Sequence, residues 1–219
     1  MQRVFLLSPA HCGGRRARMI LNPEARFDLA MRLRQHGAPL GEVFSFMSGL
    51  YFRGKLAYAR AFAHTTASID GGVMVITPNR GLVPAHAKIG IKDLQQLGQV
   101  PVDPEEPRYV RPLRRDARAL ARGLGPADRV VLLGSIGTQK YAEVLLPILG
   151  DRLFFPSAFI GRGDMSRGGL LLRCVSDRTE LEYIPVQGAI RKGRRPPKLE
   201  PRQRGYKIMH PEINCDPAQ

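Results

Sequence analysis

Residues 161–169, GRGDMSRGG, combine two arginines, one aspartate and one serine with four glycines, directly before the apolar run Leu170–Leu172. Guanidinium groups bind phosphate and carboxylate well. Glycines let backbone N–H groups approach a ligand closely. We therefore interpret this segment as the rim of an anion site, with contacts from Arg162, Gly163, Ser166 and Arg167.

Other segments share this composition. A hydroxyl residue, glycine and a base occur together in SPAHCGGRR at 8–16, TPNRG at 77–81 and GSIGTQK at 134–140. Further anion contacts are predicted for Arg15, Arg16, Arg80, Gly134, Ser135, Gly137 and Lys140, and stacking on a base or sugar for Tyr51. The third segment lacks P-loop spacing, so a turn without any ligand is an equal alternative there.

Candidate catalytic side chains are few: Ser8, His11, Ser135 and Asp164. His11 or Asp164 could transfer a proton. A loop histidine is more often simply solvated, and Asp164 also stands where it could cap a helix, which we favour as its role. No G-x-S-x-G elbow is present. No cluster of metal-ligand residues is visible, so neither a metal nor a cofactor is predicted.

The elements that must position these residues follow from hydrophobic patterning. Strands are predicted at 3–7, 73–77 and 129–134, which are nearly continuous apolar runs, and at 42–47, 154–155 and 181–186. Helices are predicted from Asn22, over 52–63, from Pro112, over 139–149 and over 165–175. This alternation predicts an α/β domain over residues 1–187, with a mostly parallel central sheet and helices on both faces. Ligands of such sheets bind beyond the carboxyl ends of the strands, where the glycine-rich segments fall.

Charge indicates the class of partner. The chain has 34 Lys and Arg against 19 Asp and Glu, a formal net charge of +15. Such a field attracts phosphate-rich partners. Residues 188–219 are rich in arginine, lysine and proline, so they predict a basic C-terminal arm rather than a packed unit. The partner expected is nucleic acid, DNA rather than RNA, or a nucleotide-like anion.

The location of the protein is inferred from cysteine usage and hydropathy. Cys12, Cys174 and Cys215 are widely separated and odd in number, which argues against a disulfide framework. The apolar run Val4–Leu7 is too short for a signal peptide, and no stretch is long enough to cross a bilayer. We expect a cytoplasmic protein with no membrane partner. The oligomeric state is left open.

A family resemblance rests on four segments in the same order. The pattern Arg162-Gly163-x-Met165-Ser166-Arg167 resembles the R-G-x-M-S-R segment of the YaaA-type peroxide-stress proteins. Ser8-Pro9-Ala10 resembles their opening I-S-P-A, and the Thr77–Pro84 turn and the pair Ser135 and Tyr141 are similar to two further segments. A fainter similarity links 73–84 and 129–149 to the core of archaeosine synthases and related tRNA-guanine modification proteins. The resemblances imply DNA binding in oxidative stress, or the handling of modified guanine.

Three functions remain open. The first is a nucleic-acid-binding protein of oxidative-stress or DNA-protection type. The second is an enzyme acting at the N-glycosidic bond of a nucleoside or modified base, with Ser8, His11, Tyr51, Ser135 and Asp164 lining one pocket. The third is a basic scaffold protein in which the C-terminal arm binds the partner. The first is preferred, because the loops have few paired acids for catalysis.

Overall fold

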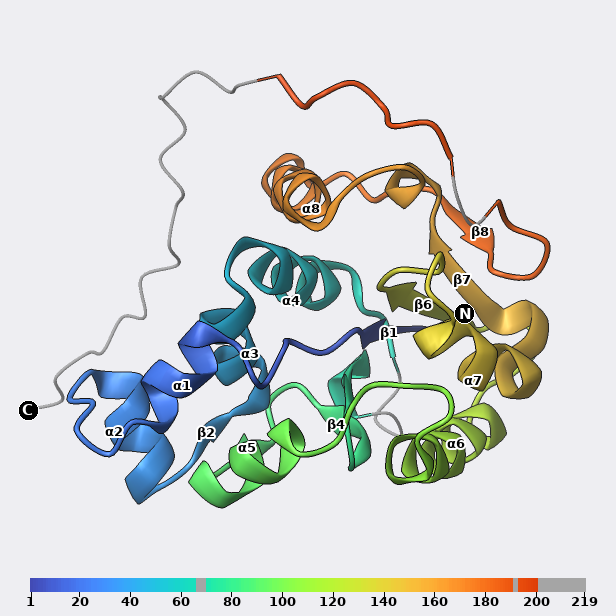
Figure 1. Ribbon diagram of the computed structural model, residues 1–219. Helices are drawn as coiled ribbons and strands as arrows, with labels where there is room; N and C mark the ends of the chain where they lie inside the picture. Colours follow the sequence, from blue (N-terminus) through green and yellow to red (C-terminus); the bar gives the residue numbers. More distant parts are fainter. Residues whose placement is uncertain (66–69, 191–192, 201–219) are drawn as a thin grey trace, which may run out of the picture.

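The computed structural model describes residues 1–65, 70–190 and 193–200 and shows a mixed α/β fold around one six-stranded sheet (Figure 1). The strand order is β4-β3-β1-β6-β7-β8. The four inner strands are parallel: β1 (Arg3–Leu7), β3 (Val73–Thr77), β6 (Arg129–Leu133) and β7 (Leu153–Pro156). The edges are antiparallel: β4 (Gly81–Pro84) and β8 (Tyr183–Pro185).

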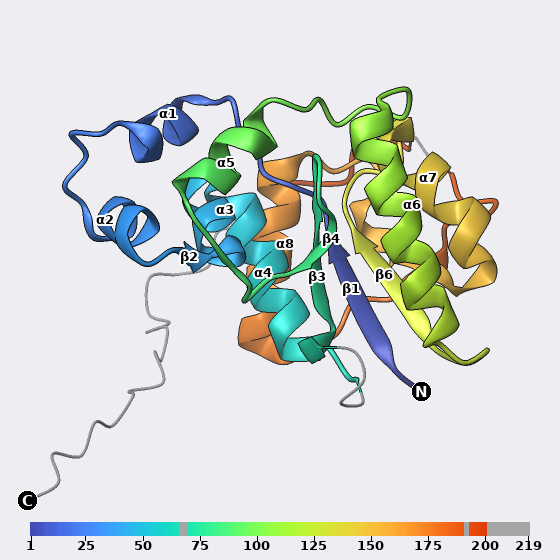
Figure 2. The ribbon, with the colours of Figure 1, turned by 90° about the horizontal axis from the view of Figure 1, so that it is seen from below.

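Helices cover both faces of this sheet, as predicted (Figures 1 and 2). One face carries α4 (Leu50–Phe62) and α8 (Asp164–Asp177), and the other carries α6 (Pro107–Arg122) and α7 (Gln139–Leu149). A smaller layer beside the sheet contains α1 (Arg15–Leu21), α2 (Asp28–Gln35), α3 (Leu40–Ser48) and α5 (Ile91–Gly98). There β2 (Ala38–Pro39) pairs with β5 (Lys88–Ile89). Short 3₁₀ turns occur at Asp70–Gly72, Gly150–Arg152 and Ser157–Phe159.

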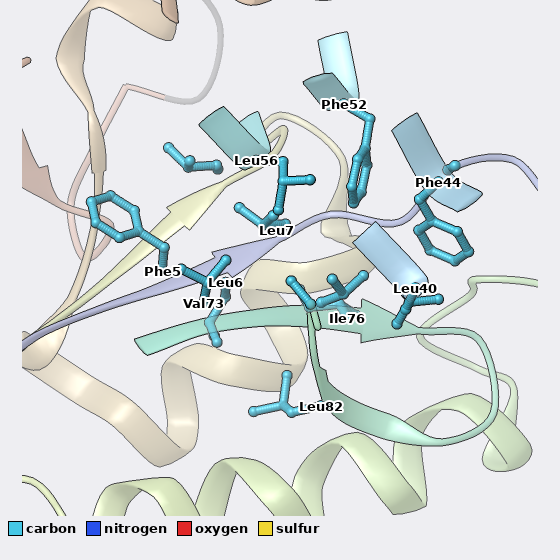
Figure 3. Close-up of a cluster of buried hydrophobic side chains, with 14 of the residues drawn as sticks. Phe5, Leu6, Leu7, Leu40, Phe44, Phe52, Leu56, Val73, Ile76 and Leu82 are labelled. Atoms are coloured by element: carbon cyan, nitrogen blue, oxygen red, sulfur yellow. The ribbon is translucent and has the colours of Figure 1, made fainter. Parts of the chain in front are cut away.

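The core explains why the inner strands read as continuous apolar runs. Residues Val4–Leu7 and Val130–Leu133 are fully buried, because helices cover both faces of the two central strands. Figure 3 shows Phe52 and Leu56 of α4 above Leu7 of β1, with Leu40 and Phe44 of α3 to one side, near Ile76 of β3. The strand predictions at 3–7, 73–77, 129–134 and 154–155 are therefore confirmed.

The strand predicted at 42–47 is wrong, because this segment belongs to helix α3. Leu40, Val43, Phe44 and Met47 are buried, and their spacing is that of a helix face rather than of a strand. The segment 42–47 is too short for its apolar pattern to distinguish the helix period of about 3.6 residues from the strand period of about 2. The tertiary contact with α4 selects the helix.

Two predicted helix starts are also displaced. Asn22 follows α1 as its C-cap, and its side-chain oxygen accepts a hydrogen bond from Glu24 N at 3.0 Å, so α2 begins only at Asp28. Helix α6 begins at Pro107 rather than Pro112. Glu106 caps it by accepting from Arg108 N at 3.0 Å. In both places a side chain bonds the backbone locally and sets the boundary.

The described start of the C-terminal arm crosses α8 (Figure 1). Arg162 donates to the Pro197 carbonyl at 3.4 Å, and Arg173 donates to the Glu200 carbonyl. Because Gly161 has no side chain, the Arg194 carbonyl can approach its backbone at a place where a Cβ would clash with it. Residues 193–200 therefore pack on the domain. The other residues of the predicted basic arm beyond Ile190, 191–192 and 201–219, lie outside the described residues.

Candidate functional site

The loops after the parallel strands meet at the carboxyl edge of the sheet, as the fold class requires. Leu7 of β1 is in register with Val75 of β3 and with Leu133 of β6. Ser8 N donates to the Leu133 carbonyl at 3.2 Å, so the first loop starts beside Gly134. A Cβ on Gly134 would meet the Ser8 Cβ at 3.0 Å, so glycine allows this close approach.

A buried lysine that the sequence patterning did not single out contacts Ser8. Lys55 Nζ donates to Ser8 Oγ at 2.7 Å and to the Ser8 carbonyl at 2.6 Å. The same ammonium lies over the ring of Tyr51, 4.4 Å from its centroid, and over that of Phe52 at 4.8 Å. Ser8 is 5% exposed and Lys55 is 1% exposed. Lys55 thus ties helix α4 to the end of β1 and places an amine beside a hydroxyl.

The crossing of α4 and α8 brings further groups to this pair. A Cβ on Gly54 would lie 2.7 Å from the Gly168 carbonyl oxygen, and one on Gly168 would lie 2.8 Å from the backbone of Tyr51. Two glycines therefore let the helix backbones touch. The contact brings Asp164 and Arg167, in the first turn of α8, close enough to act on Tyr51 and Lys55 electrostatically.

We call Ser8, Tyr51, Lys55, Tyr141, Asp164 and Arg167 the Ser8–Lys55 cluster. Tyr141, from the first turn of α7, interacts with the Ser8 side chain. The Tyr51 hydroxyl is buried and has no hydrogen bond of ordinary geometry. The Arg167 guanidinium acts on this hydroxyl electrostatically. Helices from three parts of the chain thus supply groups around one strand end.

Burial dominates the electrostatics of the cluster. Desolvation lowers the pKa of Lys55 to about 7; Asp164 raises this pKa and Arg167 lowers it, both by smaller amounts. Desolvation also raises the pKa of Tyr51 to about 12 and raises the pKa of Tyr141. At neutral pH both phenols are protonated, whereas Lys55 populates its neutral and charged forms together.

A cleft of about 580 Å³ opens next to the cluster. It is lined by residues 9–13 after β1, by Pro78 after β3, by residues 97–103 and by Lys140 and Tyr141 of α7. Tyr141 belongs to both the cleft and the cluster, because it lines the cleft and interacts with the Ser8 side chain. His11 is exposed on the cleft wall. The segments at 8–13 and 140–141 therefore do meet.

The arginines of the GRGDMSRGG segment bond mainly to the protein itself. Arg162 donates to the Ala158 carbonyl at 3.0 Å and to Ser166 Oγ at 3.2 Å. Arg167 donates to the Phe159 carbonyl at 3.1 Å, and its side chain is 12% exposed. Both guanidinium groups therefore brace the turn that leads into α8. Their predicted phosphate contacts remain predictions.

Asp164 does not cap α8, contrary to the prediction. The N-cap residue is Gly163, and no side chain bonds the free N–H groups there. Asp164 is the first helical residue, largely exposed, and lies 3.6 Å from Arg167. An acid in the first turn still favours the helix through its dipole.

The remaining candidates are spread around the edge of the sheet. Arg15 and Arg16 are exposed at the start of α1, where Arg16 also donates to the Phe46 carbonyl at 3.1 Å. Arg80, on the turn between β3 and β4, pairs with Asp93 of α5 at 3.0 Å. Ser135 is half-buried and Gly137 is exposed. Neither residue lines the cleft described above.

Sequence reasoning missed Lys55, although a signal was present. Lys55 lies between Phe52 and Leu56 on the buried face of α4, and a lysine in an apolar stripe needs a partner. Within residues 1–65, 70–190 and 193–200, no group of three or more His, Cys, Asp or Glu side chains is placed to hold a metal ion. Over the same ranges, no helix is long and apolar enough to cross a membrane.

Comparison of the chain with family models, curated proteins and solved structures gave no match. The resemblance to the YaaA-type proteins therefore stays a prediction that rests on the quoted segments.

Proposed function

We propose that this protein binds nucleic acid, with DNA as its partner, through contacts to backbone phosphates. The observation that carries the proposal is the excess of 34 basic over 19 acidic side chains in the chain, of which 26 and 16 lie in residues 1–187. Exposed bases, Arg15, Arg16 and Lys140, lie on the loops and helix starts at the carboxyl edge of the sheet. A role in oxidative stress or DNA protection is part of the proposal, supported by the YaaA resemblance.

Fluorescence anisotropy of a labelled 20-base-pair DNA duplex tests the proposal. We expect binding that weakens steeply between 50 and 200 mM salt, because each phosphate contact releases about one counterion. Two duplexes of unrelated sequence should bind alike, since phosphate contacts carry no sequence information. Absence of binding to either duplex at about 50 mM salt, at protein concentrations above the roughly 100 μM typical of weak non-specific binding, would reject the proposal.

One observation favours a second function, an enzyme acting on a nucleoside or modified base. The Ser8 hydroxyl lies 2.7 Å from Lys55 Nζ, and the lowered pKa of this amine leaves part of it neutral at pH 7. A neutral amine can accept a proton from Ser8 or from a water molecule beside it. In hydrolysis of an N-glycosidic bond, that water adds to the sugar carbon and the released base takes up the proton.

The enzyme proposal is tested with nucleosides and with DNA and RNA containing modified bases. Chromatography with mass detection would show a released base that requires both Ser8 and Lys55. Ser8→Ala and Lys55→Met should each abolish release, whereas Ser135→Ala, outside the cluster, should not. Release that is unaffected by Ser8→Ala, or no release from any of these substrates, would reject this function while leaving DNA binding open.

A further inference from the structure

Helix α6 contains more arginines, for its length, than the glycine-rich segments at 8–16, 77–81, 134–140 and 161–169. Six arginines occur in its 16 residues, and all six are exposed: Arg108, Arg111, Arg114, Arg115, Arg118 and Arg122. At about 100° per residue they share an arc of about 120°, and at about 1.5 Å per residue they extend over about 21 Å. They form one face of a single rigid element, which we call the α6 arginine face.

The opposite face of α6 is apolar and anchored. Tyr109, Val110, Leu113 and Ala117 are buried, and the helix packs against β3, β4 and α7. The Tyr109 hydroxyl also donates to the Lys140 carbonyl at 2.8 Å. The arginines are thus held in a fixed array on a buried scaffold, on the side of the sheet away from α4 (Figure 2).

Most of this positive charge has no acidic partner. Arg108 pairs with Glu106 and Arg115 pairs with Asp116, each at 2.7 Å. In the parts of the chain that the structure describes, the other four arginines of this face form no ion pair. Uncompensated guanidinium groups on one face attract an anion with several charges.

The surface on either side of α6 is hollowed. A hollow of about 630 Å³ lies toward α5 and contains Arg108, Arg111 and Arg115. A second, of about 490 Å³, lies toward α7 and contains Arg114, Arg118 and Arg122. The helix is therefore a ridge with three arginines along each flank. None of the residues lining these two hollows is aromatic.

We propose that the α6 arginine face binds the phosphate backbone of B-form duplex DNA. The inference rests on the proposed function and assigns it a surface. An α-helix with its side chains is about 10–12 Å across, and the major groove of B-DNA is about 12 Å wide. A ridge with arginines on both flanks can face the two backbones that border this groove. The lack of aromatic side chains disfavours single strands, which are bound by stacking, and the deep, narrow major groove of RNA duplexes does not admit a helix.

The test compares two variants with the same net charge. In the first, the unpaired arginines Arg111, Arg114, Arg118 and Arg122 are replaced by glutamine. In the second, four exposed arginines of α1, α4 and the loop before α2 are replaced by glutamine: Arg18, Arg26, Arg53 and Arg60. Both variants lower the net charge by four. A difference between their DNA affinities therefore reflects the position of the replaced arginines rather than the total charge.

Duplex DNA binding is measured by anisotropy over a salt series. If all four unpaired arginines contact phosphate, the slope of log affinity against log salt should become shallower by about 3 to 4 in the α6 variant, and affinity should fall at least about tenfold. The control variant should keep nearly the wild-type slope. Replacing the same four residues by lysine should also keep most of it. Circular dichroism shows whether each variant is folded. If the fourfold variant misfolds, the single variant Arg118→Gln replaces it in the test, with an expected change of about 1 in the slope.

The outcomes separate the inference from the function. If the wild type does not bind duplex DNA, the proposed function fails and the inference fails with it. If the wild type binds and the two fourfold variants lose affinity equally, the inference is overturned while DNA binding stands. If duplex RNA or single-stranded DNA binds as tightly and loses as much in the α6 variant, the assignment to B-form DNA is overturned.

Discussion

Replacing Lys55 with methionine would test how the protein holds a buried amine at the end of β1. Methionine keeps an unbranched chain of similar length but removes the charge and both hydrogen bonds to Ser8. Loss of the donor to a buried hydroxyl and carbonyl should cost about 1–3 kcal/mol of unfolding free energy at any pH. A second effect depends on pH and has the opposite sign.

The pH-dependent effect follows from the lowered pKa of Lys55. A pKa of about 7 in the folded protein, against the ordinary value of 10.5, means that the fold penalises the charged amine. Between these values the unfolded chain binds more protons at this position, so stability rises with pH. The penalty is fully present below pH 7, where both states are charged. Integrated from pH 7 to pH 9.5, the gain is about 3 kcal/mol.

Urea unfolding followed by circular dichroism at pH 7 and pH 9.5 measures this effect. The difference in unfolding free energy, wild type minus Lys55→Met, should grow by about 3 kcal/mol toward the higher pH. Lys92→Met on the exposed face of α5 is the matched control and should show no such trend. If the unfolding free energy of the wild type minus that of Lys55→Met is the same at both pH values, Lys55 has an ordinary pKa in the folded protein. The description of the cluster would then be wrong.

Three further predictions concern packing and reactivity. Gly54→Ala should lower the unfolding free energy by about 2 kcal/mol, because its Cβ would meet the α8 backbone at 2.7 Å. Gly169→Ala, whose Cβ would make only an ordinary van der Waals contact with Leu199 at 3.6 Å, should be neutral or stabilising in the same urea assay. Tyr58→Phe should cost about 1–3 kcal/mol, since its hydroxyl accepts from Leu181 N at 2.8 Å; an unchanged thermal midpoint would contradict that hydrogen bond. Cys12 should react slowly with iodoacetamide at pH 8, because burial raises the pKa of its thiol to about 12; peptide mass mapping that finds rapid native-state labelling would disprove its burial.

The central strands could be predicted because their burial leaves a direct trace in the sequence. A strand covered on both faces must be apolar at every position, and residues 4–7 and 130–133 meet that condition. The helix α3 could not be predicted in the same way, since the segment 42–47 within it has mixed apolar and polar positions that fit both the helix period and the strand period. Its packing on α4 decided the outcome.

The candidate site was predictable only in part. Glycine and hydroxyl residues after a strand mark the carboxyl edge of a parallel sheet, so Ser8 and Gly134 could be placed near one another from the sequence. The position of Asp164 and Arg167 near Tyr51 could not, because it depends on the contact between Gly54 and Gly168. The hydrogen bonds between Lys55 and Ser8 also depend on where helix α4 packs on the sheet.

The sequence by itself determined the α/β class, the apolar strands and the strong positive charge, because each depends on residue type and local period. Tertiary structure alone decided which charges act together. It turned the arginines of GRGDMSRGG toward backbone carbonyls and buried Lys55 against Ser8. It also left the α6 arginines exposed in one array. The physical reason is that burial and partner distance, rather than residue identity, determine whether a cation is available to a ligand.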